Sequence, residues 1–244
     1  ASGTSCLLAK DEQQLPPLPN TDYLLRFKIN GELMASETQA VVWPGIMIYP
    51  DSKHAIRFLE PRYLEMLDYL DAQGQNNLVI ACFKQGWDDE YFASPDLQEI
   101  ACFAELGNTK ELASGIRKSI IKGIYRVRLL REVDNDRPFR EFIYETVEEI
   151  PASASEETEL RTQLAQLNST VSENADEIQS ARSLSSVVDA VCLILPLDAD
   201  RKYKLFATLD VADRARETLR YWHDLVTDQK RFSLLPPSGS EEHN

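Results

Sequence analysis

The segment IRKSIIKGIYRVRLLREVDNDRPFREFIYETVEEI, residues 116–150, decides the fold class. Its first part alternates between apolar and basic side chains from Ile120 to Arg128, and a second alternating run follows the turn VDNDRP at 133–138. A period of two is typical of β-strands, because successive side chains point to opposite faces. The segment therefore predicts a hairpin of two long, half-exposed antiparallel strands.

After Pro151 the pattern changes from a period of two to the period of a helix. Apolar side chains recur at spacings of three, four and seven residues, which predicts four helices. Candidate N-cap residues precede three of these runs. The caps and their helices are Ser153 or Ser155 before 160–178, Asp198 before a short helix ending at Phe206, and Asp210 before 211–226; the remaining helix, 184–195, ends at Pro196.

Upstream of the hairpin, strand patterns surround one predicted helix. That helix opens at Glu60-Pro61-Arg62, since proline suits a first helical turn, and it stops at Gly74. The other expected elements are a strand over 23–29 before the Asn30-Gly31 turn, a bent or divided strand over 41–49, buried strands over 77–83 and 97–106, and a surface loop over 85–96.

Strands followed by helices predict an α+β fold. We expect a β-rich domain over residues 20–150 and a helical bundle over 151–235. Prolines at 16, 17 and 19 favour extended backbone, so residues 1–19 are predicted to form a flexible arm. The polar end of the chain, 236–244, is predicted to be a disordered tail.

Charge and cysteine content limit the partners and the location. The chain has 26 Lys and Arg against 40 Asp and Glu, a net charge of −14, which disfavours nucleic acid and anionic membranes. No apolar run approaches the ~20 residues of a membrane span, and no signal segment opens the sequence. Four widely spaced cysteines, Cys6, Cys82, Cys102 and Cys192, do not suggest a disulfide framework. We expect a cytoplasmic protein, whose oligomeric state is open.

The sequence gives little support for catalysis. Its three histidines, His54, His223 and His243, have no metal-ligand spacing. Neither a nucleophile elbow of the Gly-x-Ser-x-Gly type nor a phosphate-binding loop is present. We therefore expect a protein that is not an enzyme and that needs no metal or cofactor.

Two groups of residues are candidates for binding. Large aromatic side chains near predicted turns and loops would form a protein or peptide contact if they gathered at the surface, whereas singly each would belong to the core. These are Trp43, Tyr49, Trp87, Tyr91 and Phe92.

The second group consists of six bases within residues 117–131, namely Arg117, Lys118, Lys122, Arg126, Arg128 and Arg131. An outward strand face paired with Glu141, Glu145 and Glu149 explains them, because opposite charges across strands are modestly stabilising. An RNA-binding groove is the alternative, but it would need interleaved aromatic side chains, and Tyr125 alone is close. Pairing is the favoured interpretation.

Three segments, in order, resemble the substrate-binding N-terminal domain of the Lon protease family. The first is WPGIMIYPDSKHAIRFLEPRYLEMLDYL, with the helix start Glu60, Pro61, Arg62 and Tyr63. The second comprises DLQEIACFAEL and the hairpin strands, and the third is LPLDADRKYKLFATLDVADRARETLRYW. The likeness extends over about residues 40–226. It departs from the family at Tyr49-Pro50-Asp51, where a second Pro-Gly turn is usual, and it does not include 1–39.

This resemblance implies a six-stranded, partly closed, PUA-like pseudo-barrel with one helix, joined to an α-helical bundle. It further implies a non-catalytic module that recognises unfolded or tagged proteins and peptides, acting as an adaptor for a separate protease. Arg62 and Tyr63 would fasten the helix start to the sheet. The ATPase and peptidase parts of Lon proteases are missing, so we expect no peptide cleavage. The alternatives are an RNA-binding PUA-like module using residues 117–131 and a small-molecule sensor between barrel and bundle.

Overall fold

The computed structural model describes residues 37–43, 45–87, 94–112, 115–171 and 183–233. The predicted strand at 23–29, the arm, the tail and the end of the helix predicted over 160–178 lie outside these residues. Within the described part, the strands precede the four C-terminal helices, so the α+β fold class is confirmed. The domain boundary at residue 151 stays a prediction, because residues on both sides of it share one buried cluster.

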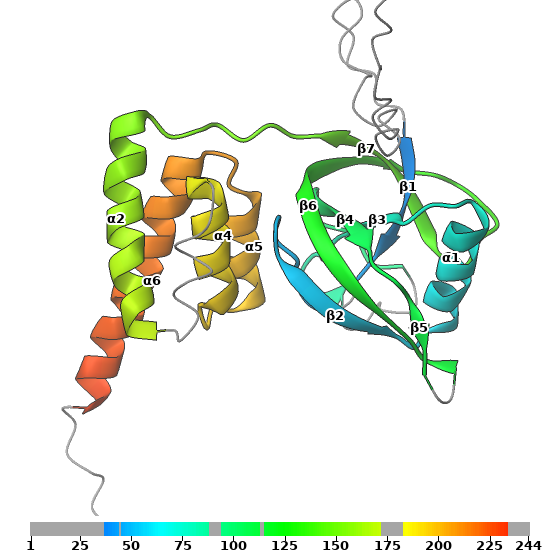
Figure 1. Cartoon of the computed structure of the whole chain (residues 1–244), viewed down its shortest axis with the longest axis horizontal. Coiled ribbons are helices and arrows are strands. Elements are labelled where there is room, and N and C mark those ends of the chain that lie inside the picture. The colour runs from blue at the N-terminus through cyan, green and yellow to red at the C-terminus, as the bar shows by residue number, and fades with distance from the viewer. Residues whose placement is uncertain (1–36, 44, 88–93, 113–114, 172–182, 234–244) are drawn as a thin grey trace, which may run out of the picture. The chain divides into compact units, whose positions relative to one another are not determined.

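Seven strands of the described part form one sheet (Figure 1). The strand order is β2-β6-β4-β3-β1-β7, and β6 pairs with β7 as well, so five strands close into a ring through β6. The two-residue strand β5 pairs with β6 outside this path. The strands are β1 Glu37–Val42, β2 Lys53–Phe58, β3 Asn77–Ile80, β4 Ile100–Leu106, β5 Lys110–Glu111, β6 Arg117–Glu132 and β7 Arg140–Thr146.

The length of β6 lets it serve two partners in turn. Its first part pairs with β2 and β4, and its last residues pair with β7. Register shifts at Phe103/Ala104 and Leu129/Arg131 mark bulges, which bend a strand as closure into a ring requires. The predicted hairpin is confirmed as β6 and β7. Its half-exposed character is not, since Arg126 and Val127 are both buried although they point to opposite faces.

Alternation along the strands supplies two hydrophobic clusters. The smaller one is enclosed by the ring and consists chiefly of Val41, Val79, Ala101, Phe103, Val127, Phe142 and Tyr144. The residues between them, such as Val42, Ile80 and Cys102, face outward and pack in the larger cluster with the helices. Burying both faces of the central strands explains why their sequences are so uniformly apolar.

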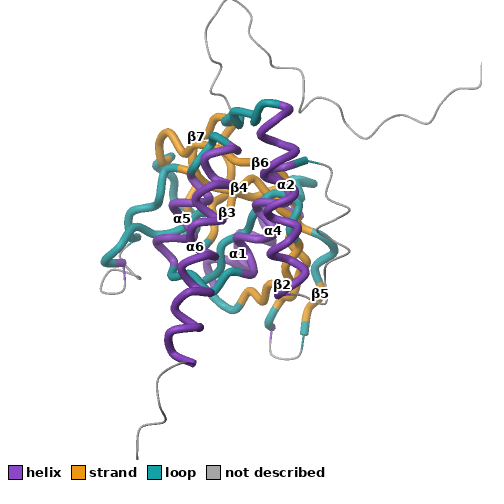
Figure 2. The backbone as a smooth tube through the Cα atoms, turned by 90° about the vertical axis from the view of Figure 1, so that its left-hand side faces the viewer, coloured by secondary structure: helices purple, strands orange, loops and turns teal. Residues whose placement is uncertain are grey.

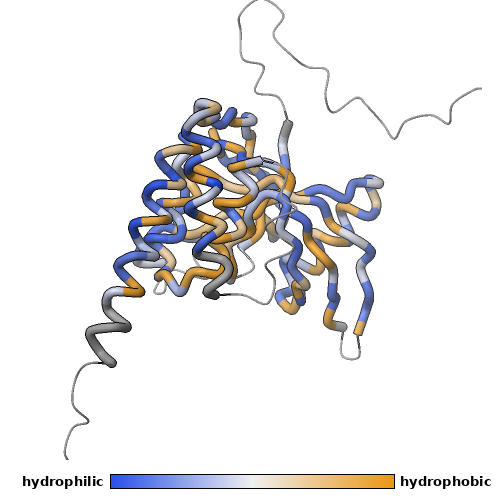
Figure 3. Tube along the Cα trace, turned by 60° about the vertical axis from the view of Figure 1, so that its left-hand side comes forward, coloured by the Kyte–Doolittle hydropathy of each residue, from blue (hydrophilic) through white to orange (hydrophobic). Residues whose placement is uncertain are grey.

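One helix, α1 (Pro61–Ala72), packs on the sheet through Tyr63, Met66, Leu67 and Leu70. The other helices are α2 (Ala154–Val171), α4 (Leu184–Ile194), α5 (Ala199–Ala207) and α6 (Val211–Ser233). They lie together to the left of the strands in Figure 1 and in front of them in Figure 2. Their apolar positions recur along one face, as the hydropathy colours of Figure 3 show. None of the helices in the described part has the length and apolar character that a membrane crossing demands.

Helix starts follow the predicted caps. Asp198 accepts a hydrogen bond from the Arg201 N–H at 2.8 Å, and Asp210 accepts one from the Asp213 N–H at 2.9 Å. Ser153 Oγ accepts from the Glu156 N–H while the Glu156 carboxylate accepts from the Ser153 N–H, which is a capping box. These local signals placed α5, α6 and α2 correctly.

Candidate functional site

An apolar groove of about 410 Å³ runs beside the end of β2 and the start of α1. Two tryptophans dominate it, and Phe83 packs between them with ring centroids 5.6 Å from each. Leu59 at the edge is 61% exposed. We call this feature the aromatic groove; its lining residues are Val42, Trp43, Gly45, Ile56, Arg57, Phe58, Leu59, Glu60, Tyr63 and Trp87.

Tyr63 ties the groove to the helix start. Its hydroxyl accepts a hydrogen bond from the Trp43 backbone N–H at 3.4 Å, and burial raises the pKa of Tyr63, so the phenol stays neutral. The Arg62 guanidinium lies 4.8 Å from the Tyr63 ring and pairs with Glu60 at 2.8 Å. Arg62 thus holds the helix start, whereas Tyr63 both fastens it and lines the groove.

The structure brings together two of the five aromatic candidates. Trp43 and Trp87, 44 positions apart in the sequence, meet through Phe83. Phe83 itself was missed, since it closes an apolar run that reads as a buried strand; β3 ends at Ile80, and Phe83 instead bridges to Leu97. Tyr91 and Phe92 lie outside the described residues.

Tyr49 is not a surface residue, and its assignment as a binding residue was wrong. It is 1% exposed, its ring packs edge-on against Phe206 at 5.4 Å, and its hydroxyl donates to the Lys202 carbonyl at 3.2 Å. Proximity to a turn suggested exposure, but α5, about 150 residues later in the chain, covers the side chain.

The basic run on β6 is not one outward face. Arg126 is 2% exposed and lies beneath the helices. Arg117 pairs with Asp68 at 2.6 Å, and Arg128 pairs with Glu99 and Glu145. The expected pairing with Glu145 and Glu149 is therefore confirmed, whereas Glu141 pairs with Arg137. The alternative of an RNA-binding module over residues 117–131 stays a prediction, and three of its six bases, Arg117, Arg126 and Arg128, are paired with carboxylates.

A second cavity, of about 760 Å³, lies between strand ends and the α5 region, where the small-molecule alternative would place a ligand. Its floor contains Ile100, Leu129, Phe142 and Tyr203. Each cation on its rim forms an ion pair with an acid. The pairs are Lys84 with Asp96, Arg128 with Glu99, and Arg140 with Glu132. The described rim residues therefore offer no unpaired cation to orient a small anion.

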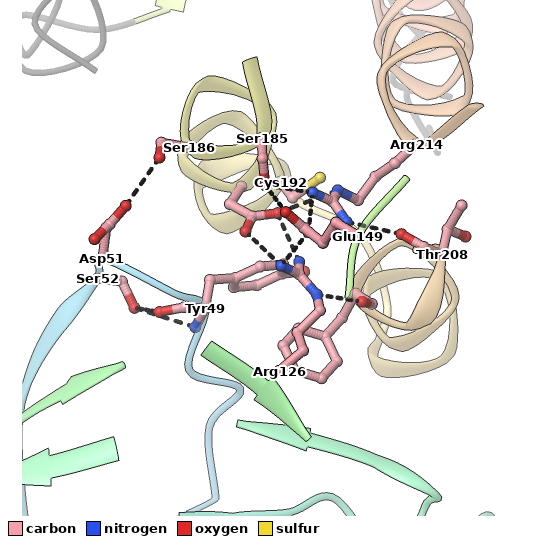
Figure 4. A network of polar contacts seen from close by, with 12 residues as sticks. Tyr49, Asp51, Ser52, Arg126, Glu149, Ser185, Ser186, Cys192, Thr208 and Arg214 are labelled. Carbon is pink, nitrogen blue, oxygen red and sulfur yellow. Dashed lines mark hydrogen bonds and ion pairs between the residues drawn. The ribbon is translucent and has the colours of Figure 1, made fainter. Parts of the chain in front are cut away.

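A buried network of charges joins the sheet to the helices (Figure 4). Arg126 on β6 donates two hydrogen bonds to Asp189 on α4, at 2.8 and 3.0 Å, and one to Glu149 at 2.8 Å. Its Nε donates to the Phe206 carbonyl at 2.8 Å. Arg214 on α6 donates to Glu149 at 2.6 Å and to Ser185 at 2.7 Å. These bonds fix the helices against β6, the strand with which the groove-lining strand β2 pairs.

Because of Glu149, the free energy of unfolding of the protein should decrease at acidic pH. Burial opposes its ionisation, but the guanidinium groups of Arg126 and Arg214 outweigh this and hold the pKa of Glu149 below its ordinary value of 4.5. A carboxylate whose pKa is lower in the folded protein than in the unfolded one stabilises the fold. This contribution is complete above the pKa of the unfolded protein and is lost as the pH falls through the pKa of the folded protein. Urea midpoints taken from about pH 7 to about pH 3 should therefore decline below about pH 4.5. Glu149→Gln should flatten that part of the curve, and an unchanged slope would contradict this role.

The described residues include no cluster of three or more His, Cys, Asp or Glu side chains that could hold a metal. Burial raises the pKa of the Cys82, Cys102 and Cys192 thiols to about 12, so these thiols stay protonated near neutrality. The aromatic groove is thus the described feature best suited to binding, and its chemistry suits apolar side chains.

Comparison with known proteins identifies a family and a shared fold. The family model described as the ATP-dependent protease La (LON) substrate-binding domain matches residues 38–223. The N-terminal domain of the Lon protease of the Mycobacterium avium complex shares 16% identity with a TM-score of 0.62, covering 77% of this chain and 99% of that one. A Lon N-terminal domain protein from Xanthomonas campestris shares 13% identity with a TM-score of 0.54, covering 82% and 100%. At these identities the two structures show a common fold. No curated protein sequence matches significantly.

Proposed function

We propose that this chain, which belongs to the LON substrate-binding domain family, binds apolar segments of unfolded or tagged polypeptides in its aromatic groove. The observation that carries the proposal is the pair of tryptophans held around Phe83 beside an exposed Leu59. Tryptophans that become buried when a partner binds contribute much of the binding free energy in protein contacts. Exposing this apolar lining to water does not stabilise the fold, and exposed apolar surfaces of this kind are typical of binding sites.

The finer part of the proposal is that the chain acts as an adaptor. The groove is lined by carbon-rich side chains, and its charged lining residues are Arg57 and Glu60. A bound polypeptide would be held there without chemical change and then passed to a separate protease. Co-purification of a protease with the intact chain, and faster degradation of a labelled client when the chain is added, test this role; an unchanged degradation rate would argue against it.

Replacing either groove tryptophan should weaken client binding. Trp43→Ala and Trp87→Ala should each cost about 2 kcal/mol of binding free energy, because each removes a large apolar contact from the centre of the site. Fluorescence anisotropy with a labelled, permanently unfolded client measures the loss. Leu130→Ala, which trims an exposed apolar side chain at 44% exposure away from the groove, is the matched control. Equal affinities for all these variants would contradict the assignment.

A further inference from the structure

Strand β2 is an edge strand beside the aromatic groove. It stands at the end of the strand order, and β6 is its strand partner in the described part of the chain. Described residues supply no other backbone hydrogen bond to 53–58. The groove lining includes 56–60, so the groove lies against the end of this edge strand. An exposed strand edge of this kind is a template for adding an extended chain.

The outward side of β2 and its neighbours is strongly basic. Lys53 lies directly opposite Lys122, and Arg57 lies opposite Lys118, which in turn faces Lys110 on β5. Between them are two small or apolar residues, Ala55 and Ile120, the latter 47% exposed. We call this surface the basic face; its cations are Lys53, Arg57, Lys110, Lys118 and Lys122.

These five cations outnumber the acids that lie opposite them in the described strand pairings. No ion pair among residues with a described position involves any of them, although most bases of the neighbouring strands and helices have carboxylate partners. Glu105 faces Lys122 across β4 and β6, but its carboxylate accepts a hydrogen bond from Asn76. Like charges opposite each other destabilise a sheet. In a chain with a net charge of −14, an anionic partner would relieve this repulsion.

The geometry favours a polypeptide over a nucleic acid. Arg57 belongs both to the basic face and to the groove lining, so the cations continue directly into an apolar site along one strand edge. Non-specific RNA binding would need exposed aromatic rings on which bases stack. Tyr125, the aromatic residue of β6, is instead stacked on Phe103 at 4.8 Å, and the two groove tryptophans are packed against Phe83.

We propose that β2 accepts an extended acidic segment of the client as an added strand. Alternate side chains of a strand point to opposite faces, as β2 itself shows with exposed Arg57 between buried Ile56 and Phe58. Carboxylates of the segment would therefore lie over the basic face while the intervening large apolar side chains enter the aromatic groove. This inference rests on the proposed function and narrows its client to segments that alternate acidic and large apolar residues.

The probe is a labelled seven-residue peptide that alternates Glu with Phe and Val, tested on the intact chain by fluorescence anisotropy. Replacing each Glu by Lys should weaken binding about tenfold or more, and added salt should narrow that difference. Two further peptides carry backbone N-methyl groups on alternate residues, in the two possible phases. Strand addition requires one phase to lose binding and the other to keep it. Equal binding of both, or no preference for Glu over Lys, would overturn the inference.

Variants of the basic face give the matching test on the protein side. Lys118→Glu with Lys122→Glu should weaken binding of the Glu peptide about tenfold and improve binding of the Lys peptide. Arg131→Glu reverses one charge, half the change of the double variant, on an exposed residue at the other end of β6, and it should leave both affinities unchanged. A single-stranded RNA that displaces the Glu peptide more strongly than unlabelled peptide does would overturn the choice of partner. If apolar clients bind but their affinity depends neither on charge nor on N-methylation, this inference alone is refuted. If the intact chain binds no apolar client at all, the proposed function is refuted.

Discussion

Replacing Arg126 by methionine should lower the free energy of unfolding by about 4 kcal/mol, because it leaves buried carboxylates without their main partner. The Arg126 side chain is 1% exposed and that of Asp189 is 2% exposed. Asp189 would keep one contact, with Arg214 Nε at 3.3 Å, and Glu149 would keep Arg214 and Ser185. Urea unfolding followed by circular dichroism measures the change.

Two further variants separate a buried charge from a general effect of removing arginine. Arg128→Met, two residues along the same strand, also removes bonds to two carboxylates, but at a half-exposed site, so it should cost less than about 1 kcal/mol. Arg126→Met combined with Asp189→Leu should recover most of the loss, because a buried ion pair can often be replaced by packed apolar side chains. If Arg126→Met and Arg128→Met unfold at the same urea concentration, the buried network does not hold the helices against the sheet.

Local signals in the sequence predicted the elements well. The alternation over 116–150 identified β6 and β7, Pro61 marked the start of α1, and Asp198 and Asp210 capped α5 and α6 as expected. Each of these features depends on residues within a few positions of one another. The resemblance to Lon N-terminal domains, drawn from three ordered segments, is confirmed by the family match over 38–223.

Features that depend on distant contacts could not be predicted in the same way. The period of two placed Arg126 and Arg128 on the same face, but nothing nearby shows that α4 and α5 cover one and leave the other half-exposed. Asp189 is a single charged residue in the apolar run 187–195. Such a charge indicates a buried ion pair, and its partner is Arg126. Had Asp189 been matched with a base in the strands, the network could have been found.

The candidate site was predicted in part for the same reason. Trp43 and Trp87 were identified as large side chains near turns, but their meeting depends on Phe83 and on the bridge to Leu97. The basic face depends on the register of β2 against β6, which places Lys53 opposite Lys122. Strand register is a property of the pairing of two segments, and neither segment shows it alone.

Replacing Gly123 by alanine should lower the free energy of unfolding by about 3 kcal/mol, since the added methyl group meets backbone that cannot easily move. A Cβ atom there would lie 2.9 Å from the carbonyl carbon of Tyr49, closer still to its oxygen, and 3.1 Å from Cys102 Sγ. Gly123 also exchanges hydrogen bonds of 3.0 Å with Asp51 N–H and the Ser52 carbonyl. Any displacement of residues 49–52 would be passed on to α5, on which Tyr49 packs, and to α4, where Ser186 bonds to Asp51 at 2.8 Å.

Gly74→Ala is the control for this prediction, because it isolates backbone strain from a steric clash. Gly74 ends α1 with a φ of +65°, and a Cβ there would meet nothing within 4 Å. Its substitution should cost about 1 kcal/mol, the usual penalty for a side chain in the left-handed region. Urea midpoints of the two variants and of the wild type decide the matter. If Gly123→Ala is no less stable than Gly74→Ala, the close approach of β6 to Tyr49 does not constrain the fold, and the contact between the sheet and α5 tolerates a shift of the 49–52 turn.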